Sequence, residues 1–93
     1  MSLTEGLQEE ACLALAELAH GHRENQEDIC SAGAVSPLVL ILRGRRMTAQ
    51  VKAAKALEAI ADHNAAIQTR FLKKSASRHL LRLLKVIYPK MEP

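Results

Sequence analysis

The stretch NQEDICSAGAVSPLVLIL, residues 25–42, decides the fold of this chain. Its first part predicts a short helix over 25–31. Its last part predicts a second helix over 35–43, in which Leu38 and Leu42 stand four residues apart and therefore share one face. A leucine face of this kind must be buried against another secondary-structure element. The stretch thus predicts two helices that pack against further elements.

The residues between these helices predict a sharp turn. Gly33 can take the left-handed conformation that ends a helix. We expect Ser36 to cap the second helix through its hydroxyl group. Pro37 suits the first helical position, because the N–H that proline lacks would have no partner there.

The sequence also matches itself at an offset of 42 residues. The matching pairs are Gln8 with Gln50, Ala11 with Ala53, Ala14 with Ala56, Leu15 with Leu57, Leu18 with Ile60, Ala19 with Ala61, Gln26 with Gln68, Ile29 with Phe71, Ala34 with Ala76, Leu38 with Leu80, Val39 with Leu81 and Leu42 with Leu84. Two segments therefore share one apolar pattern. A period of about 40–47 residues is typical of helical solenoids.

The residues favour one family of solenoids. LQEEACLALAELA, residues 7–19, followed by residues 25–42 resembles the armadillo repeat, with an Ala-rich third helix, an Asn-Gln opening, an Ala-Gly-Ala-Val turn and a Pro-Leu-Val helix. The resemblance covers residues 7–84. It is weaker in the second copy, where Ser75, Ser77, Arg78 and His79 replace Gly33, Val35, Ser36 and Pro37.

The resemblance implies an all-α fold, a right-handed superhelix of about two repeats. Residues 7–24 would form the third helix of a first repeat, 25–63 a complete repeat and 64–88 the first two helices of a further repeat, with a tail over 89–93. Solenoids need about three or more repeats for stability. We therefore expect the chain to be part of a longer array.

The apolar spacing predicts which helix faces are buried. In a helix over 8–19 we expect Ala11, Leu15 and Leu18 to point inward, opposite Glu9, Glu10 and Glu17. In a helix from Thr48, which can cap it, to about Asp62, we expect Ala53, Leu57 and Ile60 to point inward. Asn64 should open a short helix through Lys73, and a last helix should run over 76–88.

Composition limits the class of protein. Apolar residues make up 48% of the chain, with one Tyr, one Phe and no Trp, so the core must consist of small and aliphatic side chains. Cys12 and Cys30 lie within apolar helical patterns, which favours buried reduced thiols and an intracellular protein, cytoplasmic or nuclear. The longest apolar run, 35–42, is too short to span a membrane.

The net charge of +3 conceals a gradient along the sequence. Residues 1–30 hold seven acidic residues and one basic residue, a net charge of −6, whereas 31–60 sum to +4 and 61–93 to +5. In a solenoid, sequence position maps onto position along the axis. We therefore expect a lengthwise dipole that favours head-to-tail contact between copies.

Peptide-binding armadillo proteins hold an extended peptide with a Trp and an Asn on successive third helices. The matching positions here are Leu13 with Glu17 and Lys55 with Ala59, so that ladder is absent and recognition of nuclear signals is not expected. The same surface still predicts a concave groove for a protein or peptide partner. The expected contacts are Glu10, Leu13, Glu17, Lys52, Lys55 and Ala59, although these charges can equally be a solvated helix face.

A cluster of basic residues offers a second function, a nucleic-acid-associated helical module. It comprises Arg43, Arg45, Arg46, Lys73, Lys74, Arg78, Arg82 and Lys85. Single-stranded recognition usually adds aromatic platforms. Phe71 and Tyr88 are the aromatic residues available, and both occupy apolar helical positions, so a solvated basic face is the favoured reading.

No pattern predicts an enzyme, a cofactor or a metal site. His20, His22, His63 and His79 lack a recognised ligand spacing, and loop positions explain them better than zinc. The sequence has no phosphate-binding glycine loop and no nucleophile elbow.

A last apolar surface predicts self-association of the chain. Over 76–88 the leucine pattern covers more than one stripe of a helix, whereas a terminal capping helix normally has a polar outer face. The residues concerned are Leu80, Leu81, Leu83, Leu84, Val86 and Ile87.

Overall fold

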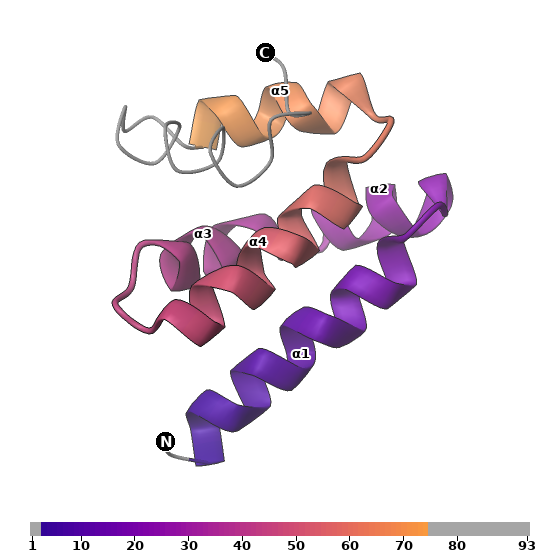
Figure 1. Cartoon of the computed structure of the whole chain (residues 1–93). Helices are drawn as coiled ribbons and strands as arrows, with labels where there is room; N and C mark the ends of the chain where they lie inside the picture. Colours follow the sequence, from indigo (N-terminus) through magenta and orange to yellow (C-terminus); the bar gives the residue numbers. More distant parts are fainter. Residues whose placement is uncertain (1–2, 75–93) are drawn as a thin grey trace.

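The computed structural model describes residues 3–74, which form five α-helices joined by short turns (Figure 1). These are α1 (Leu3–Ala19), α2 (Arg23–Ser31), α3 (Val35–Leu42), α4 (Met47–Ala61) and α5 (Ala65–Lys74). The described residues contain no strand, so the predicted all-α class is confirmed for this part of the chain. The predicted helix over 76–88, with Leu80, Leu81, Leu83, Leu84, Val86 and Ile87, lies outside the described residues, as does the tail over 89–93.

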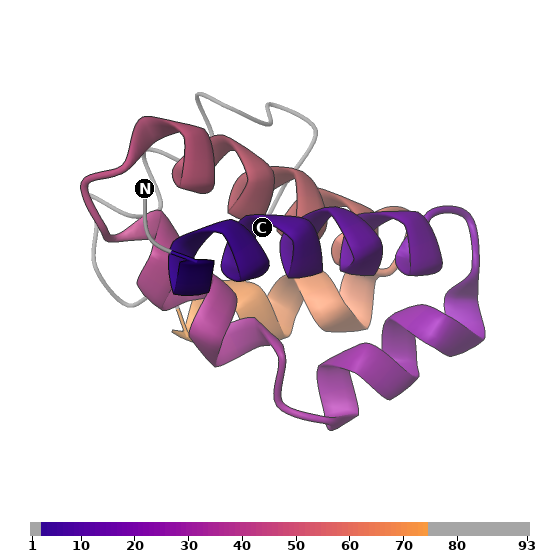
Figure 2. The same ribbon diagram turned by 90° about the horizontal axis from the view of Figure 1, so that it is seen from below.

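Helix α4 is the centre of the fold and packs against each of the other four helices. Ala53, Leu57 and Ile60 are at most 1% exposed, which confirms their predicted inward direction. Helices α1 and α4 lie side by side and run in the same direction (Figures 1 and 2). Small side chains on both helices allow this close approach, because an alanine adds little bulk between two helix axes.

The predicted inward face of α1 is confirmed only in part: Leu15 packs against the core, but the other predicted positions differ. Ala11 is exposed and Leu18 is 55% exposed, whereas Glu9, expected on the solvent side, is 5% exposed. The face toward the core contains Cys12 and Ala19, both buried. Cys12 follows Glu9 by three residues, so the two share one side of the helix. Small side chains, Leu15 and an ion-paired carboxylate therefore face α4 and the core, whereas Leu7 and Leu18 point outward.

The turns between the helices agree in part with the turn and the helix caps predicted from the sequence. Gly33 has a φ of 87°, which confirms the left-handed turn after α2. The expected caps at Ser36 and Thr48 are wrong, because the N-caps are Ala34 and Arg46, each two residues earlier, and neither helix has a side-chain cap. Pro37 consequently lies in the first turn of α3, where the backbone N–H groups have no intrahelical partner and proline is tolerated.

Two other residues do cap helices. The Nδ1 atom of His22 accepts a hydrogen bond of 3.1 Å from the Asn25 backbone N–H at the start of α2. The Oδ1 atom of Asn64 accepts one of 3.3 Å from the Ile67 backbone N–H, which confirms that Asn64 opens α5. The cap at His22 was not predicted, since the sequence indicated only a loop histidine.

A buried amide holds the end of α4 in place. Gln26 is 3% exposed, and its Nε2 atom donates to the backbone carbonyls of Ala59 and Asp62, each at 3.0 Å. Asn64 donates from Nδ2 to the Gln26 Oε1 atom at 3.4 Å. The last carbonyls of a helix lack intrahelical partners, so this link between α2, α4 and α5 satisfies polar groups that would otherwise be buried without bonds.

None of the helices in residues 3–74 is both long and apolar enough to cross a membrane.

Candidate functional site

The residues predicted to form a groove lie on α1 and α4, the two parallel helices. Glu17, Lys55 and Ala59 line one hollow of about 440 Å³. Its other lining residues are Ala16, His20, Glu58 and Asp62. The structure therefore brings Glu17 together with Lys55 and Ala59, which follow it by 38 and 42 positions in the sequence. Glu17 of α1, Glu58 and Lys55 of α4, and Asp62 after α4 give the hollow a mixed charge.

The other three predicted residues differ in their surroundings. Glu10 is exposed and Leu13 is half-buried on α1. The Nζ atom of Lys52 lies 2.8 Å from the Oε1 atom of Glu9. The Lys52 ammonium group is therefore already paired with a carboxylate within the protein.

Four charged residues clamp α1 to the start of α4. Besides Lys52, Arg46 contacts the Glu9 carboxylate, and its Nη1 atom lies 2.8 Å from the Oε2 atom of Glu5. The Glu9 side chain is 6% exposed, whereas those of Arg46 and Lys52 are each 32% exposed. Arg46 belongs to the basic cluster proposed for nucleic acid, so one of its charges is already paired with carboxylates.

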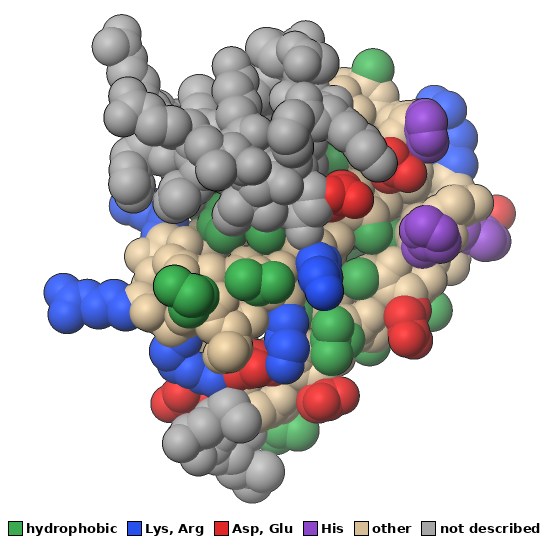
Figure 3. Space-filling view, in the orientation of Figure 1, with side chains coloured by type: hydrophobic (Ala, Val, Ile, Leu, Met, Phe, Trp, Pro, Cys, Tyr) green, Lys and Arg blue, Asp and Glu red, His purple; other side chains and the backbone are tan. Residues whose placement is uncertain are grey.

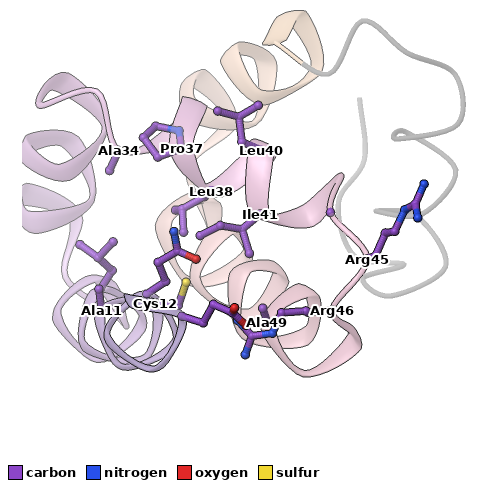
Figure 4. Close-up of a pocket in the computed structure, with 14 residues that line it drawn as sticks. Ala11, Cys12, Ala34, Pro37, Leu38, Leu40, Ile41, Arg45, Arg46 and Ala49 are labelled. Atoms are coloured by element: carbon purple, nitrogen blue, oxygen red, sulfur yellow. The ribbon is translucent and has the colours of Figure 1, made fainter. Parts of the chain in front are cut away.

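A second, larger hollow lies between α1 and α3 and was not predicted (Figure 4). Its volume is about 540 Å³. Apolar side chains from both helices face it, and Glu5, Gln8, Arg45 and Arg46 supply its polar lining. The apolar lining residues are Ala11, Cys12 and Leu15 of α1, Ala34 before α3, Pro37, Leu38, Leu40 and Ile41 of α3, and Ala49 of α4.

The thiol of Cys12, at the wall of this hollow, is 2% exposed, and both cysteines of the described part are free and buried, as predicted. Burial raises the pKa of the Cys12 thiol, and the positive charge of Lys52 partly opposes that rise. A neutral, buried thiol is a poor nucleophile. Its contribution is therefore to packing.

The surface shown in Figure 3 intersperses acidic, basic and hydrophobic side chains, and its histidines gather at one end. Within residues 3–74 no three His, Cys, Asp or Glu side chains are arranged to hold a metal ion.

No family model matches this sequence, and neither the curated proteins nor the solved structures include a significant match to it.

Proposed function

We propose that this chain is a non-catalytic protein-interaction module of the armadillo type, which binds a peptide or protein partner on the surface of α1 and α4. The repeat of 42 residues and the parallel packing of α1 on α4 support the solenoid assignment. Reduced buried cysteines support an intracellular location, in the cytoplasm or nucleus.

The observation that carries this proposal is the hollow that joins Glu17, Lys55 and Ala59. It offers a cation and carboxylates beside apolar side chains along two parallel helices. A peptide presents backbone amides and side chains of both signs, so a surface of mixed charge suits it better than one of a single sign.

The basic cluster supports nucleic-acid binding less well. Arg46 is held by Glu5 and Glu9, which leaves Arg43 and Arg45 as the exposed basic side chains of the loop before α4. Binding to a duplex requires several phosphate contacts at once.

A pull-down with a matched control tests the proposal. The double variant Glu17→Ala with Lys55→Ala should lose a protein partner that the wild type captures from lysate. The variant Glu24→Ala with Arg70→Ala also removes one acidic and one basic exposed residue, on α2 and α5, and should keep that partner. If both variants captured the partner equally, the proposal that the partner binds in this groove would be contradicted. A salt-sensitive shift of a labelled oligonucleotide would favour the nucleic-acid alternative.

A further inference from the structure

The internal repeat shows that α1 has an uncovered apolar face. In α4 the side chains of Ala49, Ala53, Ala56 and Ile60 are at most 4% exposed. Their counterparts 42 positions earlier form a stripe on α1 at spacings of four, three and four residues, which places them on one face. We call these residues the open stripe: Leu7, Ala11, Ala14 and Leu18. All four are exposed, with Leu7 at 61% and Leu18 at 55%.

The difference between the two helices comes from their neighbours. Helix α4 packs against both α1 and α3, and in this position its stripe is buried. Within the described residues, no helix packs against α1 in the way that α3 packs against α4. Figure 2 shows α1 in front of the remaining helices on one side of the molecule.

The hollow in Figure 4 continues this uncovered surface onto α3. Ala11 belongs both to the open stripe and to the lining of the hollow. Across the hollow, Leu40 of α3 is 65% exposed. An apolar helix placed there would contact α1 and α3 together, and large exposed apolar surfaces of this kind mark interaction sites.

The sequence indicates which helix suits this position. The counterpart of α3 in the repeat is residues 76–88, in which Leu80, Leu81 and Leu84 match Leu38, Val39 and Leu42. At these three apolar positions the segment therefore matches α3, one of the helices that pack against α4.

Charge complementarity indicates the same occupant. Glu10 and Glu17 are exposed on α1, each three residues after a member of the open stripe, so they lie beside it. Residues 76–88 carry Arg78, Arg82 and Lys85 and no acidic residue. Opposite charges around an apolar centre set orientation and suppress other arrangements.

We propose that a second copy of this chain docks on the open stripe, with its residues 76–88 lying against α1 as α3 lies against α4. Copies then join head to tail, because the donor and acceptor surfaces are different parts of the chain. If each copy receives the segment of a different copy, the contacts form a ring or an open filament, whereas two copies that exchange segments form a two-fold dimer. The open stripe contains none of the six residues predicted for the peptide groove, although Glu10 and Glu17 lie at the edge of both surfaces.

Paired charge reversal tests this arrangement in the full chain. The acceptor variant carries Glu10→Lys and Glu17→Lys, and the donor variant carries Arg78→Glu and Arg82→Glu. Each variant alone places like charges together, so we expect its apparent dissociation constant for self-association to rise at least about tenfold. A mixture of the two variants restores opposite charges at every contact. We therefore expect the mixture to associate as the wild type does.

Sedimentation velocity from micromolar to millimolar protein measures these effects, with circular dichroism to verify folding. The control Glu24→Lys with Asp28→Lys changes the same amount of charge on α2 and should associate normally. Leu18→Gln alters an exposed apolar residue and should weaken association without changing the thermal midpoint.

Three results would overturn the proposal. A wild-type chain that stays monomeric at millimolar concentration has no such contact. Oligomers that persist in both single variants use another surface. A monomer whose thermal stability falls in the acceptor and donor variants, and recovers when all four changes are combined in one chain, would show that residues 76–88 dock within their own copy.

Discussion

The clamp around Glu9 makes the sharpest prediction about stability. Glu9→Gln keeps the size of the side chain and removes its charge, which leaves Lys52 and Arg46 beside a neutral amide. Breaking a fully buried ion pair costs about 3–5 kcal/mol, and an exposed pair contributes about 0–1 kcal/mol. Because Glu9 is buried and its two partners are one-third exposed, we expect a loss of about 2–3 kcal/mol in the free energy of unfolding.

Urea denaturation followed by helical circular dichroism measures this loss. A decrease of 2 kcal/mol should also lower the thermal midpoint by about 8–16 °C in a domain of this size. Glu10→Gln is the matched control, because Glu10 is the next residue along α1 and is exposed, and we expect a change within about 0.5 kcal/mol. Equal stabilities of the two variants would refute the clamp.

Three further changes test separate parts of the fold. Gly33→Ala places a methyl group where no atom lies within 4 Å, so its cost is the strain of a φ of 87° alone, about 1–2 kcal/mol by urea titration. Gln26→Leu removes both hydrogen bonds to the end of α4 and should cost about 2–3 kcal/mol, with loss of amide protection in hydrogen exchange at the start of α5. The pKa of Cys12 is raised in the fold, so the unfolded thiol ionises first as pH rises above about 8.5, and stability should decrease from there until pH passes the folded pKa. Cys12→Ala should flatten that part of the pH profile, and an unchanged slope would exclude a contribution from Cys12.

Local patterns predicted the positions of the helices well. Gly33 and Asn64 act through their own neighbours in sequence, so their roles can be read from a few residues. The inward face of α4 followed from apolar spacing, because every residue that the fold buries on this helix is Ala, Leu or Ile.

The rotation of α1 could not be read in the same way. Glu9 was assigned to solvent because it is charged, but its partners Arg46 and Lys52 lie 37 and 43 positions away. The apolar period of one helix does not indicate which charged residues of another helix will pair with it. One available signal was Cys12, which was predicted to be buried and shares a helix face with Glu9.

The hollow between α1 and α3 also went unpredicted. The sequence predicted a buried face with Leu38 and Leu42 and made no prediction for Leu40, which is 65% exposed. Burial of α3 depends on which neighbours are present on each side, and the apolar spacing of one helix does not specify them. The repeat of 42 residues does show which face of a helix lacks a neighbour, but only after the exposure of matching residues in α1 and α4 has been compared in the structure.

The most direct test of this account compares solvent access at matched positions of α1 and α4. Ala14→Cys and Ala56→Cys occupy equivalent places in the repeat, and the buried native thiols Cys12 and Cys30 serve as references within the same chain. Thiol modification in dilute protein, located by peptide mass spectrometry, should be rapid at position 14 and strongly slowed at position 56. Equal rates at the two positions would contradict the claim that α1 exposes the stripe that α4 buries.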